Sequence, residues 1–282
     1  MHYDRHTINP HPSAKKLFDT FGYLVIPGLL KDCIEEVSNT FNQLFEQNAS
    51  EVVDWRHEAH YMKSRRFLLQ FIERDPKLSA LLDHPVISGI FNSLLGEDYL
   101  YRASDGNIFT GDTYWHSDLY GAFFKYRHVK ILLYLEPLDA NNGGFRAIPG
   151  SHLFGDKFAN LCERYVWKHE KHLGLEKDDV PAITIPTQPG DALVFDYRLK
   201  HATNHTQSNR RMMSICASQR FSDEDLPELA RLTQMFLDMA GGGTAYHPRF
   251  IEHATPTQRT HMTQCLEAYQ YIQDGKLGKP VA

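Results

Sequence analysis

Cysteine is scarce in this sequence, and the few cysteines lie far apart. Only four occur among 282 residues, at Cys33, Cys162, Cys216 and Cys265, and no two of them form a C-x-x-C pair. This spacing argues against a zinc knuckle and against a disulfide framework. The cysteine content is therefore typical of a protein that functions in a reducing compartment.

Long apolar segments and an excess of positive charge are also missing. The N-terminal stretch M-H-Y-D-R-H-T-I-N-P contains no apolar core of a signal peptide, and no later stretch approaches about 18 consecutive apolar residues. The formal net charge is −5, which argues against a general binder of nucleic acid or anionic membranes. We therefore expect a cytoplasmic protein that has neither a nucleic-acid nor a membrane partner.

The residues that are present can build a sizeable core. Hydrophobic residues make up 42% of the chain and charged residues 23%, which is ordinary for a globular protein. Barrels and sandwiches of this length often form one unit. We expect a single domain over residues 1–282, with a core at about 99–221, a helix-and-strand region at 1–98 and a helical tail at 222–282.

Helical spacing of apolar residues occurs mainly outside the predicted core. Residues 51–76 fit neither a helical nor a strand pattern, and we make no prediction for them. The first twelve residues predict an irregular arm, and Tyr23 to Leu30 predicts a strand that Pro27 and Gly28 interrupt. The predicted helices cover residues 13–21, 31–48, 76–95, 153–173, 222–236 and 256–272.

From Tyr99 onward the pattern changes to short alternating or apolar runs that turn residues separate. Typical separators are Asp105-Gly106, Pro149-Gly150 and Pro189-Gly190-Asp191. Many short strands with such punctuation predict a mainly β fold, a double-stranded β-helix or jelly roll with flanking helices. The strand-like runs cover residues 99–103, 107–110, 113–118, 129–135, 143–150, 182–186, 191–196 and 212–218.

One of these runs, Y-W-H-S-D-L-Y-G, carries two metal-ligand residue types at strand spacing. His116 and Asp118 lie two residues apart, and residues i and i+2 of a strand point to the same face. They match two ligands of the 2-His-1-carboxylate triad that holds non-haem Fe(II) and leaves coordination positions open. His201, which follows the apolar strand after Pro-Gly-Asp, is the expected third ligand. His205 is the competing candidate, in the presumed loop after that strand.

A strand further on begins with two arginines. Arg210 shares a face with Ser214, whereas Arg211 points to the opposite face, so only one arginine can enter the barrel. A buried guanidinium requires an anionic partner, and its planar fork suits a bidentate carboxylate. We favour Arg210, and Arg211 stays the alternative.

The combined motifs resemble the phytanoyl-CoA dioxygenase (PhyH) superfamily of Fe(II)/2-oxoglutarate-dependent oxygenases. The resemblance spans roughly Phe18 to Phe221 and begins with F-x-x-x-G-Y-L-V-I-P-G-L-L. It continues with H-S-D, then L-Y-L-E-P-L-D-A-N-N-G-G-F-R-A-I-P-G-S-H, and then P-G-D-A-L-V-F-D-Y-R-L-K-H-A-T-N-x5-R. Each piece alone is common, but the combination in this order is specific to the superfamily.

The resemblance implies a set of cofactor contacts and a reaction. Iron would be bound by His116, Asp118 and His201. Arg210 would pair with the C5 carboxylate of 2-oxoglutarate, Thr203 would support that carboxylate, and Asn107 would contact the other end. With Fe(II), 2-oxoglutarate and O2, such an enzyme hydroxylates a small molecule and releases succinate and CO2.

The carboxylate ligand bears on the outcome of the reaction. Halogenases that resemble this superfamily have a small residue in place of the aspartate, so Asp118 favours hydroxylation, or a related desaturation or cyclisation, over halogenation. Two other classes remain open. One is a non-catalytic jelly roll that binds metal and ligand, and the other is an O2-independent metal-dependent hydrolase or isomerase with the same ligands.

Contacts with the substrate are less constrained by the pattern. The residues assigned to the substrate pocket are Tyr120, Phe124, Lys125 and Arg146. Trp115 alternates with His116 and is expected to pack outside the barrel. Arg65 and Arg66 are interpreted as a solvated basic face, and contact with an anionic group of the substrate is the alternative. The sequence does not name the substrate, and the C-terminal helices could pair two protomers as a homodimer.

Overall fold

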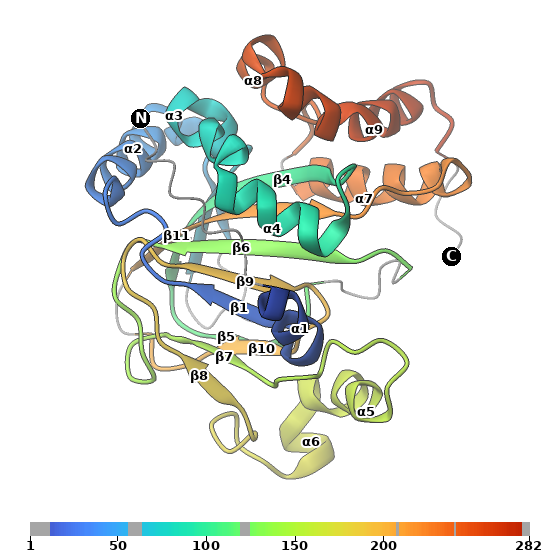
Figure 1. Ribbon diagram of the computed structural model, residues 1–282. Coiled ribbons are helices and arrows are strands. Elements are labelled where there is room, and N and C mark those ends of the chain that lie inside the picture. Colours follow the sequence, from blue (N-terminus) through green and yellow to red (C-terminus); the bar gives the residue numbers. More distant parts are fainter. Residues whose placement is uncertain (1–11, 56–63, 119–124, 207–208, 240, 278–282) are drawn as a thin grey trace.

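The computed structural model describes residues 12–55, 64–118, 125–206, 209–239 and 241–277 (Figure 1). Within these residues, the strands form two antiparallel sheets, of seven and four strands. The larger sheet lies between a helical layer and the smaller sheet (Figure 1). This arrangement is the jelly-roll core, with flanking helices, that the sequence predicts.

The larger sheet combines strands from the whole chain. In spatial order it contains β1 (Tyr23–Ile26), β9 (Ala192–Asp196), β6 (His128–Tyr134), β11 (Arg210–Ser218), β4 (Leu100–Thr110), β3 (Ser64–Leu69) and β2 (Val53–Trp55). The smaller sheet contains, in order, β5 (Thr113–His116), β10 (His201–Thr203), β7 (Phe145–Ala147) and β8 (Ile183–Ile185). Since β1, β2 and β3 precede residue 99, the larger sheet extends beyond the predicted core.

Helices cover the outer face of the larger sheet and one end of the smaller sheet. The α-helices are α1 (Pro12–Phe21), α2 (Ile34–Gln47), α3 (Pro76–Ser79), α4 (Pro85–Leu95), α5 (Lys157–Tyr165), α6 (His169–Leu173), α7 (Leu226–Met239), α8 (Pro248–His253) and α9 (Pro256–Gln273). The 3-10 turns are η1 (Ala49–Glu51), η2 (Ile72–Arg74), η3 (Ala80–Asp83), η4 (Val166–Lys168) and η5 (Asp223–Asp225). Helices α5 and α6 form the predicted insertion near the smaller sheet (Figure 1).

Strand alternation separates an outer core from an inner face. On β6, Ile131 and Leu133 belong to the cluster beneath the helices, whereas Leu132 and Tyr134 belong to the cluster between the two sheets. On β11, Met213 packs outward in the same way. Because side chains of a strand alternate between faces, every second residue of β4, β6 and β11 faces the interior of the jelly roll.

The N-terminal boundaries follow local chain chemistry. Gly22 ends α1 with a positive φ of 84°, and its amide donates a hydrogen bond to the carbonyl of Phe18. A Cβ at this position would lie 2.6 Å from the ring of His152, so only glycine fits without displacement of that ring. The predicted strand from Tyr23 ends at Ile26, because Pro27 and Gly28 turn the chain.

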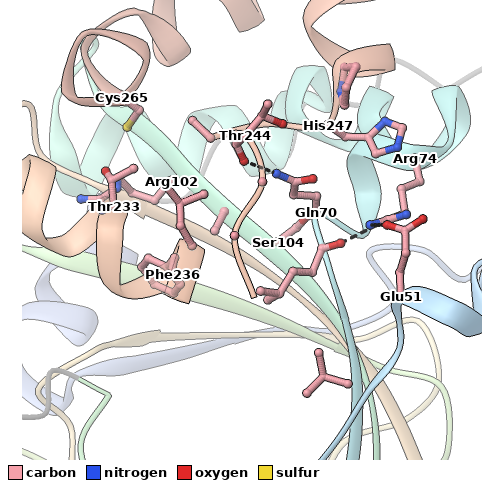
Figure 2. Close-up of a pocket in the computed structure, with 18 of the residues that line it drawn as sticks. Glu51, Gln70, Arg74, Arg102, Ser104, Thr233, Phe236, Thr244, His247 and Cys265 are labelled. Carbon is pink, nitrogen blue, oxygen red and sulfur yellow. Dashed lines mark hydrogen bonds and ion pairs between the residues drawn. The ribbon is translucent and has the colours of Figure 1, made fainter. Parts of the chain in front are cut away.

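Two cavities lie beneath α7. The inner chamber has a volume of about 300 Å³, lies between the sheets and is lined by residues such as His116, Lys130 and Arg210. The outer chamber has a volume of about 520 Å³ and is shown in Figure 2. Residues 241–248, which follow α7, form part of its wall.

The described residues include no single helix that is both long and apolar enough to cross a bilayer. The segments Pro76–Asp83 and Pro85–Leu95 meet the criterion only when joined, and they are bent by 49°. Their apolar side chains, among them Leu81 and Ile90, are buried in the core between the helices and the larger sheet.

Candidate metal centre

Two neighbouring strands of the smaller sheet place both histidines at one point. His116 at the end of β5 is the register partner of His201 at the start of β10. Asp118 follows two residues later, and its backbone amide donates a 2.8 Å hydrogen bond to the carbonyl of Tyr197. The pairing of β5 with β10 therefore brings together the three predicted ligands from two distant parts of the chain.

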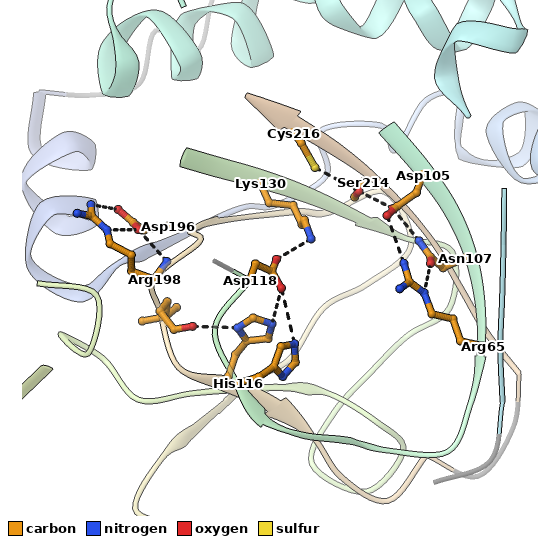
Figure 3. A network of polar contacts seen from close by, with 12 residues as sticks. Arg65, Asp105, Asn107, His116, Asp118, Lys130, Asp196, Arg198, Ser214 and Cys216 are labelled. Carbon is orange, nitrogen blue, oxygen red and sulfur yellow. Dashed lines mark hydrogen bonds and ion pairs between the residues drawn. The ribbon is translucent and has the colours of Figure 1, made fainter. Parts of the chain in front are cut away.

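The donor atoms of the three side chains form a compact cluster, of which Figure 3 labels His116 and Asp118. Nε2 of His116 lies 3.6 Å from Oδ1 of Asp118, and Nε2 of His201 lies 3.7 Å from the same oxygen. The three ligand atoms lie within 4.8 Å of one another. Two imidazole nitrogens and one carboxylate oxygen at this spacing fit a divalent transition metal such as Fe(II).

Both imidazoles are oriented from behind by the backbone. Nδ1 of His116 is hydrogen-bonded to the carbonyl of Tyr114 at 2.7 Å, and Nδ1 of His201 to that of Leu199 at 2.9 Å. Each carbonyl fixes the tautomer with a proton on Nδ1, so the lone pair of Nε2 points into the cluster. The ring of His201 also stacks on Phe145, with centroids 4.8 Å apart and planes 14° apart.

The protonation states also suit metal binding. Burial, together with the neighbouring His116, lowers the pKa of His201 to about 3. Burial likewise lowers the pKa of His116. Burial alone would raise the pKa of Asp118, but Lys130 and the two imidazoles hold it well below its usual range. At neutral pH the site therefore offers two neutral imidazoles and one carboxylate.

Lys130 on β6 is a site residue that the sequence analysis did not identify. Its Nζ lies 2.6 Å from Oδ2 of Asp118, so one carboxylate oxygen is held while the other faces the imidazoles. Burial would lower the pKa of Lys130, but Asp118 holds it well above its usual value. Its signal in the sequence is a single lysine inside the apolar run V-K-I-L-L-Y-L.

A second polar network lines the inner chamber on the side of β3 and β4 (Figure 3). Asp105 accepts hydrogen bonds from Asn107 at 2.7 Å and from Ser214 at 2.5 Å. Arg65 donates to Asn107 at 2.7 Å and lies 3.3 Å from Asp105. The interpretation of Arg65 and Arg66 as a solvated face is therefore wrong for Arg65, which is buried, and fits Arg66, which is exposed.

Arg210 lies in the wall of the inner chamber, as predicted. Its guanidinium carbon is 5.2 Å from the ring centroid of Phe109 and 5.9 Å from that of Tyr134. Its Nη1 donates to the carbonyl of Gly143 in the Asn-Asn-Gly-Gly turn. A Cβ on Gly143 would lie 3.1 Å from that nitrogen, so glycine allows the turn to approach the arginine.

Arg211 lies on the opposite face of β11 and does not reach the inner chamber. Its Nε is 2.6 Å from Oε1 of Glu136, and its Nη1 donates to Ser38 and Asn42 of α2. His205, the competing metal ligand, is 54% exposed and lies 3.3 Å from a carboxylate oxygen of Asp178. His205 therefore lies away from the metal cluster, and Arg211 lies outside the inner chamber.

The remaining predicted cofactor residues, Thr203 and Asn107, lie on different strands. Thr203 on β10 lines the inner chamber, and its hydroxyl accepts a 3.0 Å hydrogen bond from the amide of Thr113. Both ends of the Asn107 amide are engaged, with Asp105 and with Arg65. Asn107 therefore supports two residues that face the chamber, and its own contact with 2-oxoglutarate stays a prediction.

The residues assigned to the substrate have different positions. Tyr120 and Phe124 lie outside the described residues. Lys125 is at the surface, 2.6 Å from Asp225, and does not line the inner chamber. Arg146 also points away from the chamber, because Phe145 occupies the inward position of β7.

Arg146 instead fixes an outer loop. It donates hydrogen bonds to the carbonyls of Lys177, Asp178 and Val180, and its guanidinium carbon lies 5.3 Å from the ring centroid of Trp115. Trp115 is 1% exposed and packs in a cluster outside the barrel, as predicted. The assignment of Arg146 to the substrate pocket is thus not supported by its position.

Residues 18–213 match the phytanoyl-CoA dioxygenase (PhyH) family over more than half of the chain. The chain belongs to the PhyH family. The match includes the three clustered ligands, Lys130 and Arg210, and it ends inside β11. The C-terminal helices α7, α8 and α9 lie beyond the part of the chain that matches the PhyH family.

Solved structures share the fold of this PhyH protein at low sequence identity. The 2-oxoglutarate-dependent carbocyclase SnoK from nogalamycin biosynthesis is 19% identical, with a TM-score of 0.58 and coverage of 75% of this chain and 85% of that chain. EctD from S. alaskensis is 18% identical, with a TM-score of 0.58 and coverage of 77% and 80%. HygX from Streptomyces hygroscopicus, solved with nickel and 2-oxoglutarate, is 18% identical, with a TM-score of 0.57 and coverage of 75% and 88%. No curated protein sequence matches the chain.

Proposed function

We propose that this PhyH protein is an Fe(II)- and 2-oxoglutarate-dependent oxygenase that hydroxylates a small molecule. The observation that carries the proposal is the cluster of His116, Asp118 and His201, whose three donor atoms lie within 4.8 Å of one another, with His201 buried and the other two partly buried. Three protein ligands leave coordination positions for a cosubstrate and for O2. The family match and the bound 2-oxoglutarate of the similar HygX structure support the same cofactors.

The polar residues of the inner chamber that surround the metal and cosubstrate positions have distinct roles in this proposal. His116, Asp118 and His201 bind the metal, and Lys130 holds the outer oxygen of the carboxylate. Arg210 binds the distal carboxylate of 2-oxoglutarate, and the hydroxyl of Thr203 lies in the same chamber wall.

The apolar wall of the inner chamber is expected to protect the reaction from water. Fe(II), 2-oxoglutarate and O2 together supply the oxidising power that replaces a C–H bond of the substrate by C–OH, with succinate and CO2 as co-products. Apolar side chains such as Leu132, Phe195 and Met212 line the rest of the chamber and keep bulk water away from the reacting carbon. This dry surrounding also strengthens the contact between Arg210 and a carboxylate.

Hydroxylation is the simplest outcome for a complete triad. Asp118 occupies the carboxylate position, which leaves no protein-made vacancy for a halide. The similar solved structures include a carbocyclase and an epimerase as well, so the same fold serves several oxidative outcomes. For this chain we propose C–H hydroxylation, with the product to be identified by mass spectrometry.

The test is succinate formation from 2-oxoglutarate with added Fe(II) and O2. The His116→Ala variant should lose this activity by at least about 100-fold, because two ligands cannot hold the metal in place. His205→Ala is the matched control, because its imidazole is exposed and outside the cluster, and it should retain activity. Equal activity of wild type and His116→Ala, or turnover without O2, would contradict the proposal.

A further inference from the structure

The outer chamber contains a buried arginine without a neutralising partner in the described part of the chain. Arg102 on β4 is 8% exposed, and its Nε and Nη1 atoms donate no hydrogen bond within the described residues. No ion pair among these residues includes Arg102, and the ring of Phe221, 6.0 Å from its guanidinium carbon, is an adjacent aromatic group. A lone guanidinium in such a place is costly unless an anion completes the site.

A backbone irregularity gives Arg102 its position. Along β4 and β11, Cys216 pairs with Ala103 and Ala217 pairs with Tyr101, so Arg102 has no register partner on β11. This is a β-bulge, a device that redirects a side chain out of the regular alternation of a strand. The bulge turns Arg102 toward the wall that it shares with Thr233 of α7 (Figure 2).

The hydrogen bonding of Arg102 differs from that of the other arginine in the outer chamber. Arg74 also lines the chamber, but its donors are used by the carbonyl of Leu69, by Asn48 and by Glu51 at 2.8 Å. His247, in contrast, has a buried Nδ1 without a hydrogen bond among the described residues. Among the described residues, the chamber therefore holds an uncompensated cation, Arg102, and an unused ring nitrogen, Nδ1 of His247 (Figure 2).

The outer chamber meets the inner chamber rather than lying apart from it. Leu69, Ala103, Ser104 and Phe236 line both chambers. Helix α7 forms a common roof, since Thr233 and Leu237 face the outer chamber while Met235 and Met239 face the inner one. A ligand that fills both chambers would pass Phe236 on its way from Arg102 toward the metal cluster.

We propose that Arg102 binds an anionic group of the substrate, a carboxylate, phosphate or sulfate, while the carbon to be oxidised lies in the inner chamber. The inference rests on the proposed function, because it assigns a substrate class to that site. It gives Arg102 a role separate from that of Arg210, which binds the carboxylate of 2-oxoglutarate in the proposed function. Part of the outer wall, from Thr233 to Cys265, lies beyond the matched family segment, whereas Arg102 itself lies inside that segment.

The first test uses inorganic phosphate as the probe and needs neither metal nor turnover. Wild-type protein in EDTA is titrated with phosphate at constant ionic strength, and thermal unfolding reports the apparent dissociation constant. Arg102→Met should raise the dissociation constant for phosphate about 10- to 100-fold, because charge-assisted hydrogen bonds to the anion are lost. If phosphate stabilises the wild type no more than chloride does, or stabilises Arg102→Met equally, the proposal fails.

The stability of the variant without phosphate is a second readout. Arg102→Met replaces an uncompensated buried charge by an apolar side chain of similar length, so its melting temperature should equal or exceed that of the wild type. A lower melting temperature would mean that the guanidinium has a structural partner and would overturn the proposal. Arg231→Met is the matched control, because Arg231 is exposed on the same helix α7, pairs with Glu228, and should not affect phosphate binding.

A third experiment separates this inference from the proposed function. Candidate metabolites with a carboxylate or phosphate are compared with their neutral methyl esters for stimulation of succinate formation. Only the anionic members should stimulate the wild type, and stimulation by the neutral esters would overturn the substrate class. If no compound yields succinate, the proposed function fails, whereas the phosphate titration still decides whether Arg102 is an anion site.

Discussion

Lys130 and Asp118 form a buried ion pair in which Nζ lies 2.6 Å from Oδ2, on the side of the carboxylate that faces away from the imidazoles. The pair leaves Oδ1 directed toward Nε2 of both histidines, at 3.6 and 3.7 Å. Lys130 therefore fixes which oxygen can bind a metal, and it favours monodentate coordination. Positioning of a ligand by an outer partner is a general property of metal sites.

Substitution of Lys130 should loosen the metal site. In Lys130→Met, Asp118 loses the bond that orients it, and metal affinity should fall about 10-fold, in line with other outer partners of ligands. The missing positive charge opposes this effect, but the orientation of the ligand should dominate. Titration with Mn(II), followed by EPR, measures the dissociation constant. Lys125→Met is the control, because Lys125 pairs with Asp225 at the surface; equal or tighter binding by Lys130→Met would refute the role.

Replacement of the two adjacent arginines of β11 should affect different properties, namely 2-oxoglutarate affinity for Arg210 and the free energy of unfolding for Arg211. Arg210→Met should weaken 2-oxoglutarate binding about 10- to 100-fold, because a charge-assisted bidentate contact is lost inside the inner chamber. Arg211→Met should leave that affinity unchanged and lower the free energy of unfolding by about 1 kcal/mol, since it detaches α2 and Glu136. Calorimetric titration and urea unfolding measure the two effects, and the reverse pattern would contradict the assignment.

Glu73 should make stability depend on pH. It is 2% exposed, and burial raises its pKa from 4.5 to about 7, even though Tyr101 and the amide of His247 donate hydrogen bonds to it. The folded protein therefore binds the proton more tightly than the unfolded chain between these values. The stabilisation is complete below about pH 4.5 and is lost as pH rises through 7, by about 2 to 3 kcal/mol between pH 5 and 8.

Urea unfolding of wild type and Glu73→Gln at several pH values tests this dependence. A glutamine can accept from the amide of His247 and donate to the phenolic oxygen of Tyr101, so the fold should survive the change. The difference between the two proteins should shrink or reverse as pH rises from 5 to 8. A difference that stays constant over this range would show that Glu73 does not titrate in the folded state.

Gly106 should be intolerant of a larger side chain. A Cβ there would lie 2.4 Å from the ring of Phe71, which packs against Phe41 and Phe45 at 4.9 and 5.8 Å between centroids. We expect Gly106→Ala to lower the free energy of unfolding by about 1 to 3 kcal/mol through overpacking. Adding Phe71→Leu should recover part of this loss in a double-mutant cycle, and strictly additive effects would argue against the clash.

The sequence predicted His116 and Asp118 from their local spacing, and His201 from its place after an apolar strand and from the family resemblance. Asp118 follows two residues after His116, which ends β5, and strand alternation separated Arg210 from Arg211. Arg146 could not be placed in this way, because β7 has only three residues and its inward position is set by pairing with β8 and β10. The expected homodimer stays a prediction.

Buried charges were the main feature that the sequence concealed. Arg65 follows Ser64 in the short strand β3, beside exposed Arg66, and only pairing with β4 reveals that Arg65 faces inward. Lys130 meets Asp118, which lies twelve residues earlier, and Arg102 gains its surroundings from α7, far away in the chain. Such contacts depend on sheet order and on a bulge, which residue patterns do not encode directly.

The eleven-residue strand β4 carries Arg102 at one end and Asp105 next to the inner chamber. If Arg102 binds the anionic group of the substrate, this strand sets the distance between that group and the carbon that is oxidised. Regioselectivity would then follow from strand register, since insertion of two residues between positions 102 and 105 would keep the side-chain faces and lengthen this distance by about 6.6 Å. Related chains could thereby select longer or shorter molecules while their iron ligands stay the same.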